Sequence, residues 1–216
     1  MFKISLAFFL ACLVATATCN PQHELAVDWT TPKKEGDMLP EVDFITRVQE
    51  GEEFAWKTVS TSHYCANKRI VIFALPGAFT PTCSASHLPG YHTNYADIKQ
   101  AGIDEVYCLS VNDAFVMRQW GLAMDLTEEN GDFTTVKMIP DGAAAFTRGM
   151  GMSTVWSSER GFGERSWRYS MVVKDCVIEK MFVEQPMLQN SGPDPYEVSD
   201  ADTMLRYLKS NGLDEL

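Results

Sequence analysis

The chain has 216 residues, of which 45% are hydrophobic, and its formal net charge is −11 at pH 7. These values fit one ordinary globular domain with a full apolar core, and they exclude a collagen-like or intrinsically disordered chain. An acidic chain is repelled by the phosphates of nucleic acids and by anionic lipid surfaces. We therefore expect neither nucleic acid nor a membrane among its partners.

Residues 1–17 have the organisation of a secretory signal peptide. Lys3 supplies one positive charge, residues 4–14 are almost wholly apolar, and residues 15–17 (ATA) form a small-residue cleavage pattern. The apolar run is shorter than the roughly 20 residues of a membrane-spanning helix. We predict cleavage after Ala17 and a secreted, endomembrane or periplasmic location. The alternatives are an uncleaved anchor and an organellar presequence, for a plastid or mitochondrion.

The polar residues 18–37 are predicted to form an extended lead-in to one domain over 38–216. A hairpin is expected within 51–68. Residues 69–75 (RIVIFAL) form a short continuous apolar run, which is typical of a central strand buried on both faces. Pro76-Gly77 ends this strand.

After this strand, helices and strands alternate. The sequence predicts a helical region over 81–100 with a bend at Pro89-Gly90, a strand over 105–111, and a helix over 113–125 capped by Asn112 or Asp113. A strand over 136–139 and a helix around 142–150 follow, and then a hairpin of 169–174 and 177–183 that turns at Asp175-Cys176. The last helix is predicted to begin at a Ser199-Asp200 capping box, to run to about Lys209 and to be closed by Gly212. This order predicts an α/β fold of the thioredoxin-like type, with a central mixed sheet flanked by helices.

Six cysteines are scattered along the chain: Cys12, Cys19, Cys65, Cys83, Cys108 and Cys176. They form no C-x-x-C pair and no zinc-ribbon spacing, and a small exported disulfide scaffold would be denser in cysteine. We therefore expect the domain to fold on its apolar core and to keep cysteine for chemistry or packing. Cys108 lies in an apolar strand and is predicted to be a small core side chain.

Cys83 is the candidate reactive group. It follows a buried strand and a loop, and it falls where a helix begins, so backbone N–H groups and the helix dipole favour a thiolate there. The Thr80 hydroxyl can lie beside the sulfur, and Pro76 and Pro81 stiffen and shield the loop. These local features fit a reactive cysteine and an inert, buried cysteine equally well.

The motif Pro76-x-x-x-Thr80-x-x-Cys83 matches the P-x-x-x-T-x-x-C signature of peroxiredoxins. Over residues 38–210 the chain resembles this family, and specifically its type-five subfamily. The strings that carry the subfamily resemblance are PGAFTPTCSASHLPGY (76–91), CLSVNDAFV (108–116) and RYSMVV (168–173).

The resemblance implies that Cys83 is the peroxidatic nucleophile and that Thr80, with backbone N–H groups, holds the peroxide oxygens. It also implies that Pro76 shields the thiolate and that Arg168 completes the site. A permanent cation with a planar fork suits that role because it stabilises the thiolate and can hold two oxygens; the alternative is a surface arginine at a strand end. Arg165 is expected to be solvated, or to share in the site.

The resemblance further implies a peroxidase that needs no cofactor, protects against oxidants and reduces hydrogen peroxide or organic hydroperoxides to water or alcohol. Glutathione, glutaredoxin or thioredoxin would be the reductant, and a homodimer would form through the face around the active-site loop. Some type-five members carry a resolving cysteine near the C-terminus, but residues 185–216 contain none. Cys65 and Cys176 are expected a strand length or more from Cys83, so we predict recycling by an external thiol.

Several competing interpretations are weaker. Cys83, His87 and His92 could form a metal site, but three ligands on one kinked helix are unusual, and no metal is predicted. A cysteine hydrolase with His87 as base lacks an orienting carboxylate or carboxamide; His87 is expected to pack beside the loop. A thioredoxin-like electron carrier would need a C-x-x-C pair. An added holdase or redox-sensor role has no sequence feature for or against it.

Overall fold

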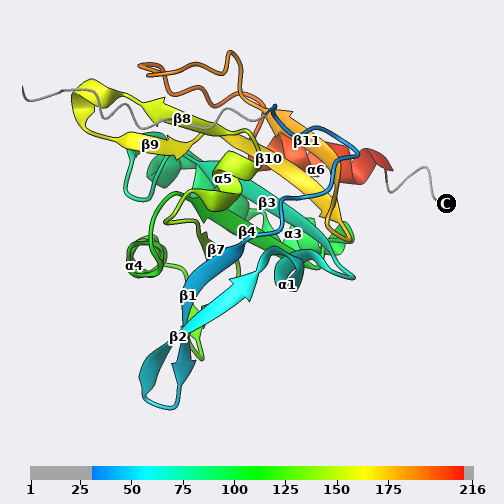
Figure 1. Ribbon diagram of the computed structural model, residues 1–216. Coiled ribbons are helices and arrows are strands. Elements are labelled where there is room, and N and C mark those ends of the chain that lie inside the picture. Colours follow the sequence, from blue (N-terminus) through cyan, green and yellow to red (C-terminus); the bar gives the residue numbers. More distant parts are fainter. Residues whose placement is uncertain (1–30, 212–216) are drawn as a thin grey trace, which may run out of the picture.

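The computed structural model describes residues 31–211, so the predicted signal peptide and Gly212 lie outside the described residues (Figure 1). Its centre is a five-stranded mixed sheet in the order β11-β10-β3-β4-β7. The strands are β3 (Arg69–Leu75), β4 (Glu105–Ser110), β7 (Lys137–Pro140), β10 (Tyr169–Lys174) and β11 (Val177–Val183). The first three are parallel to one another, β10 pairs antiparallel with β3, and β11 pairs antiparallel with β10. The expected α/β fold with a mixed sheet is confirmed.

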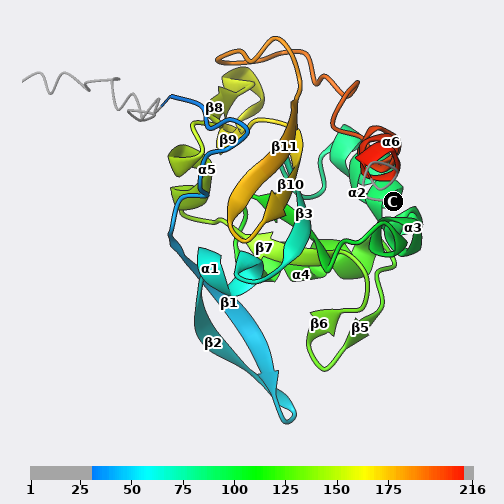
Figure 2. The same cartoon turned by 90° about the vertical axis from the view of Figure 1, so that its right-hand side faces the viewer.

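The strand β3 is buried on both faces, as its unbroken apolar run predicts. Val71, Phe73 and Leu75 point into one apolar core, and Ile70 and Ile72 point into the other, because successive side chains of a strand face opposite ways. Helices cover both faces (Figures 1 and 2). The first core is closed by α2 (Leu88–Thr93), α3 (Tyr95–Gln100), α4 (Ala114–Ala123) and α6 (Ala201–Asn211), and the second by α1 (Thr61–Cys65) and α5 (Ala145–Gly149).

The early hairpin begins sooner than predicted. Its strands are β1 (Asp43–Glu50) and β2 (Glu53–Ser60), and it projects from the body of the domain (Figure 2). The prediction of a hairpin within 51–68 was wrong because β1 buries little: Phe44 is its one fully buried side chain, so the alternating pattern is weak.

Four short strands were not predicted. They form two hairpins: β5 (Glu128–Glu129) with β6 (Asp132–Phe133), and β8 (Ser153–Trp156) with β9 (Gly163–Ser166). Segments of two to four residues carry too few side chains to show a hydrophobic period. Between β8 and β9 lies one 3-10 turn, η2 (Ser158–Arg160).

The helical region over 81–100 bends elsewhere than predicted. It starts with a π-helical turn, η1 (Cys83–His87), and Pro89 then lies in the first turn of α2, where a missing N–H breaks no bond of that helix. The break comes at Asn94, whose side chain donates to the Gly90 carbonyl at 2.9 Å.

Local signals placed three other features correctly. Asp113 caps α4 and accepts hydrogen bonds from the N–H groups of Phe115 and Val116. The β10–β11 hairpin turns at Asp175-Cys176, where both residues have positive φ, as a two-residue hairpin turn requires. Asp200 caps α6 by accepting from Thr203 N–H at 2.9 Å.

Residues 33–38, at the join between lead-in and domain, are bonded to the body of the protein. Lys33 N–H donates to the Met150 carbonyl, and Met38 pairs with Val177 at the β10–β11 turn. Among residues 31–211, no helix is long and apolar enough to cross a bilayer.

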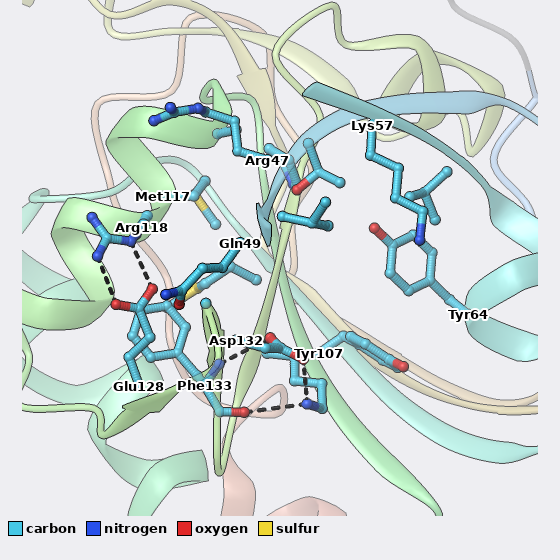
Figure 3. Close-up of a pocket in the computed structure, with 18 of the residues that line it drawn as sticks. Arg47, Gln49, Lys57, Tyr64, Tyr107, Met117, Arg118, Glu128, Asp132 and Phe133 are labelled. Atoms are coloured by element: carbon cyan, nitrogen blue, oxygen red, sulfur yellow. Dashed lines mark hydrogen bonds and ion pairs between the residues drawn. The ribbon is translucent and has the colours of Figure 1, made fainter. Parts of the chain in front are cut away.

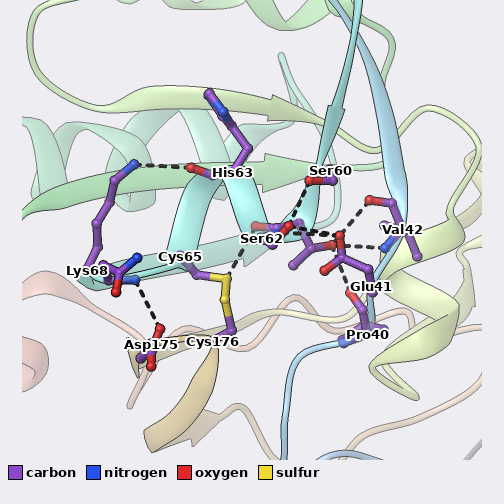
Figure 4. Close-up of a disulfide and its surroundings, with 12 residues drawn as sticks. Pro40, Glu41, Val42, Ser60, Ser62, His63, Cys65, Lys68, Asp175 and Cys176 are labelled. Atoms are coloured by element: carbon purple, nitrogen blue, oxygen red, sulfur yellow. Dashed lines mark hydrogen bonds between the residues drawn. A yellow bond between two sulfur atoms is a disulfide. The ribbon is translucent and has the colours of Figure 1, made fainter.

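Two cysteines form a disulfide that the sequence analysis did not predict. Cys65, at the end of α1, is bonded to Cys176, with the two Cα atoms 4.9 Å apart (Figure 4). The expectation that cysteine serves only chemistry or packing was therefore wrong. Since β10 is antiparallel to β3, its far end meets the beginning of β3, and both cysteines lie at that edge.

This disulfide closes 111 residues of sequence. A double Cys65→Ser/Cys176→Ser variant is expected to lose about 2–5 kcal/mol of its free energy of unfolding, because the unfolded chain regains the freedom that the bond removed. Urea unfolding with and without dithiothreitol measures this. The wild type should be destabilised by the reductant and the double variant should not; a wild-type midpoint indifferent to reduction would contradict the prediction.

Candidate active site

The loop after β3 is held from two sides. Ala78 N–H donates to the Asn112 side-chain oxygen at 3.0 Å. Gly77 is so close to Arg165 that a Cβ atom at Gly77 would lie 2.6 Å from Arg165 Nη1. Phe79 has a φ of 62°. The loop thus has a fixed course before it reaches Cys83.

Cys83 and Arg168 meet, as the resemblance implied. Cys83 is the first residue of η1 and is fully buried, and Arg168 directly precedes β10 with a side chain that is also fully buried. Arg168 Nη1 donates to Cys83 Sγ at 3.6 Å. Burial alone would lower the pKa of Arg168, but the Cys83 thiolate and then Asp194 raise it. The guanidinium is therefore a permanent cation beside the sulfur.

Arg168 is oriented by further partners. Its Nη1 also donates to His87 Nδ1 at 3.0 Å, and its Nη2 forms an ion pair with Asp194. The Tyr196 ring lies 5.7 Å from the guanidinium carbon. Arg168 Nε is buried and has no hydrogen-bond partner among the described residues, so the guanidinium keeps a donor for a ligand.

His87 is a neutral imidazole. Its Nε2 lies 3.2 Å from the Ser199 carbonyl, which can only accept, so Nε2 carries the proton and Nδ1 accepts from Arg168. Burial, together with the charge of Arg168, holds the pKa of His87 well below its usual value. The sequence analysis placed His87 beside the loop without a role. Its spacing of four from Cys83, which puts both on one helix face, was the available signal.

Thr80 lies in the loop and is nearly buried. Its hydroxyl donates to the Gly77 carbonyl at 2.8 Å, and no described hydrogen bond joins it to Cys83 Sγ. Its proton is thereby engaged, and its oxygen lone pairs can accept a hydrogen bond from a bound hydroperoxide. The Thr80 carbonyl accepts from Ser84 N–H at 3.0 Å and starts the helical turn.

A cavity of about 200 Å³ opens beside this loop. Pro76, Thr80 and Asp194 line it, with Trp156 and Phe162 as apolar walls. The predicted Pro76 and Thr80 thus face a space that can receive a small molecule, whereas Cys83 is covered.

Arg165 is not solvated. It is half-buried on β9, donates from Nε to the Phe162 carbonyl at 3.0 Å and from Nη1 to the Pro76 carbonyl at 3.4 Å. The expectation of a solvated side chain was wrong because β9, a strand that the sequence did not reveal, runs beside the loop. Arg165 supports the loop and adds positive charge near Cys83.

Cys108 is a buried core residue, as predicted, and belongs to the same apolar cluster as Cys83. Burial, with the nearby Cys83 thiolate, raises the pKa of the Cys108 thiol well above its usual value. It therefore stays protonated and is a poor nucleophile. Within residues 31–211, Cys83 and Cys108 are the free cysteines.

The alternatives around the histidines find no support. His87 is engaged by Arg168, and His92 Nδ1 bonds to the Thr135 hydroxyl at 2.9 Å. The described part of the chain has no group of three or more potential metal ligands. The alternative of a metal site built from Cys83, His87 and His92 is therefore not supported among the described residues.

A larger cavity, of about 370 Å³, lies elsewhere, between the β1–β2 hairpin and the β7 edge of the sheet (Figure 3). Tyr64 and Tyr107 line it together with ion pairs such as Arg118–Glu128, at 2.6 Å. None of the predicted site residues belongs to it, so the smaller cavity is the candidate for peroxide.

Comparison with known proteins identifies the family of the chain. The model of the redoxin family matches residues 34–205. Peroxiredoxin sll1621 of Synechocystis is 48% identical over 178 residues, covering 80% of this chain and 90% of that protein. The hybrid peroxiredoxin hyPrx5 of Haemophilus influenzae is 48% identical over 174 residues, covering 81% of this chain and 66% of that protein. The solved structure of the Plasmodium falciparum antioxidant protein, a 1-Cys peroxiredoxin, has a TM-score of 0.74 and 32% identity, covering 82% of this chain and all of that one.

A fully buried cysteine paired with arginine on this α/β scaffold is the candidate site, and the chain belongs to the redoxin family. Within that family it is a peroxiredoxin of the type-five kind, with the thioredoxin fold of its structural relatives. It is therefore an enzyme that reduces peroxide.

Proposed function

We propose that this peroxiredoxin reduces hydrogen peroxide and organic hydroperoxides at Cys83, with Thr80, Pro76 and Arg168 as the other site residues. The observation that carries the proposal is the 3.6 Å contact between Arg168 Nη1 and Cys83 Sγ. This contact supports a thiolate at the buried Cys83. The cavity beside the loop has apolar walls at Trp156 and Phe162, which suit the organic part of a hydroperoxide.

In the reaction, the Cys83 thiolate attacks the nearer peroxide oxygen. An S–O bond forms as the O–O bond breaks, so the sulfur is oxidised to sulfenic acid while the peroxide is reduced by two electrons. The leaving oxygen departs as hydroxide or alkoxide and takes up a proton from solvent to give water or alcohol. Arg168 stabilises the charge that develops on this oxygen, and Thr80 accepts the peroxide proton in a hydrogen bond that orients the substrate.

The direct test mixes the reduced protein with hydrogen peroxide in a stopped-flow instrument and follows the second-order loss of the Cys83 thiol. Saturation with one equivalent of peroxide, and mass-spectrometric location of the product on Cys83, are expected. Oxidation that appears first at another cysteine would contradict the proposal.

Thr80→Val is expected to slow the peroxide step by about a hundredfold and to leave the fold intact. Valine has the shape of threonine without its hydroxyl, so the substrate loses a partner that acts at the reacting oxygens. Thr134→Val is the matched control and should react like the wild type, because the Thr134 hydroxyl also donates to a backbone carbonyl, that of Thr127 at 3.2 Å, but does not line the candidate peroxide cavity. Equal rates for Thr80→Val and the wild type would remove Thr80 from the site.

For recycling, we infer that the Cys83 sulfenic acid is reduced by an external thiol. Glutathione would form a mixed disulfide with Cys83 and release water; a second glutathione, a glutaredoxin or a thioredoxin would then exchange with it. Two facts support this single-cysteine cycle. Cys108 is a protonated core thiol, and Cys65 and Cys176 are bonded to each other.

Cys108→Ser is therefore expected to keep turnover with glutathione and glutaredoxin close to the wild-type level. After peroxide treatment with glutathione present, mass spectrometry should find glutathione on Cys83. The same experiment on Cys19→Ser covers the remaining cysteine of the predicted mature chain. Accumulation of an internal Cys83 disulfide, with loss of turnover in either variant, would show that the cycle uses a second cysteine.

We further propose a homodimer through the face around the active-site loop. Phe79 on that loop and Phe115 on α4 are both about half exposed, and Trp56 meets the Phe115 ring at 5.3 Å. The Ala78–Asn112 hydrogen bond brings the loop beside the start of α4. Light scattering should find a dimer in the wild type and a monomer in Phe79→Ser; a wild-type monomer at micromolar concentration would reject the proposal.

For location, we propose cleavage after Ala17 and export to an oxidising compartment. The Cys65–Cys176 disulfide supports this, because such bonds persist mainly outside reducing compartments. N-terminal sequencing of protein from its native source should begin at Thr18. Retention of residues 1–17 would sink this proposal.

A further inference from the structure

A chain of hydrogen bonds leads from the buried carboxylate of Glu184 to the sulfur of Cys83. The Glu184 carboxylate is almost fully buried at the end of β11. Its Oε1 accepts from the N–H groups of Glu197, Val198 and Ser199, each at 2.9 Å, and from the Ser199 hydroxyl at 2.7 Å. Burial alone would raise the pKa of Glu184, but these four bonds lower it. A permanent anion thus fixes the turn that precedes α6.

The turn before α6 directs the Ser199 carbonyl toward η1 and α2. The Ser199 carbonyl accepts from His87 Nε2–H at 3.2 Å and from the Tyr91 hydroxyl at 3.0 Å. Because Nε2 must then carry the proton, His87 Nδ1 is left as an acceptor, and it accepts from Arg168 Nη1 at 3.0 Å. The same Nη1 donates to Cys83 Sγ, so its two hydrogens are shared between histidine and sulfur.

We propose that His87 is a positioning residue for the peroxide step, a neutral acceptor held by the Glu184-fixed turn that aims one N–H of Arg168 at Cys83. The inference rests on the proposed roles of Cys83 and Arg168. Asp194 lies in the segment between β11 and α6 and accepts from the other terminal nitrogen of Arg168, Nη2. Without His87, Nη1 is free to rotate away from the sulfur while the ion pair persists.

Two substitutions separate this role from packing. In His87→Asn, the side-chain oxygen takes the place of Nδ1 and keeps the acceptor for Arg168, but the bond to Ser199 is lost. In His87→Gln, the amide nitrogen takes the place of Nε2 and keeps the bond to Ser199, but the acceptor is lost. His92→Leu is the control, because His92 lies on the same helical segment and bonds to Thr135 instead.

The measured quantity is the second-order rate of Cys83 oxidation by hydrogen peroxide. His87→Asn and His92→Leu should react close to the wild-type rate, and His87→Gln should be about 10- to 100-fold slower, as for loss of one hydrogen bond to a charged group. In an Arg168→Met background, His87→Gln should cause no further slowing. The reverse order of Asn and Gln, equal rates for both, or additive losses with Arg168→Met would overturn the proposal.

A second measurement does not depend on any variant. The ¹⁵N spectrum of the wild-type histidines at pH 7 should show His87 as the neutral tautomer protonated at Nε2. A proton on Nδ1 would exclude acceptance from Arg168 and overturn the proposal. If Cys83→Ser kept its activity, the site assignment would fail; if it is inactive and the His87 results are negative, only the positioning role fails.

Discussion

Cys83→Ser is expected to abolish peroxide reduction. A serine hydroxyl is not ionised at neutral pH, and His87, the imidazole beside position 83, is no free base, because its Nδ1 accepts from Arg168 and its Nε2 is protonated. The hydroxyl therefore has neither the charge nor the polarisability of a thiolate, and the O–O bond is not attacked. Peroxide consumption with glutathione and glutaredoxin, coupled to NADPH oxidation, should fall to the uncatalysed rate.

Cys108→Ser is the matched control for this variant. It removes the other free thiol of residues 31–211, from the same apolar cluster and with the same change of atom. Its activity should persist, which separates loss of the nucleophile from a general disturbance of the core. More than a small residual activity in Cys83→Ser would reject Cys83 as the nucleophile.

Arg168→Met should retain the fold and react with peroxide about 10²- to 10³-fold more slowly. Methionine fills part of the buried volume but supplies no donor, so the charge that develops on the leaving oxygen loses its partner. Asp194 also loses its counter-ion, but this carboxylate faces the cavity and can be hydrated. Stopped-flow oxidation by hydrogen peroxide measures the effect as the second-order rate of Cys83 oxidation.

The control for Arg168→Met is Arg118→Met. Arg118 also pairs with a carboxylate, Glu128 at 2.6 Å, but it lies beside the larger cavity away from Cys83. Its peroxide rate should match that of the wild type. If Arg168→Met and Arg118→Met gave the same rate, Arg168 would not be the cation of the site.

The sequence predicts the strand and loop that carry Cys83 better than it predicts the distant residues that pack against Cys83. The apolar run of β3 and the breaker Pro76-Gly77 locate the loop, because burial on both faces leaves a continuous pattern. Arg168 cannot be found this way, since 85 residues separate it from Cys83; only the resemblance supplied it. Asp194 carries no signal in sequence, because its position depends on the irregular segment between β11 and α6.

The disulfide shows where a prediction was available and was not made. Cys65 was expected near the beginning of β3 and Cys176 at the turn of the last hairpin. Had β10 been paired with β3 as an antiparallel neighbour, both cysteines would have fallen at the same edge of the sheet. Composition alone does not give the order of the strands in the sheet. That order decides which cysteines, far apart in the sequence, lie close enough to form a disulfide.

The strand β3 has sulfur chemistry at both ends. It is seven residues long, or about 23 Å at roughly 3.3 Å per residue, and it separates the Cys65–Cys176 bond from Cys83. Thiol–disulfide exchange needs direct contact between sulfur atoms, so within one chain a Cys83 that has been oxidised cannot exchange with the Cys65–Cys176 disulfide. If Cys83 is the peroxidatic residue, as we propose, each turnover changes the oxidation state of Cys83 and leaves the Cys65–Cys176 cross-link oxidised.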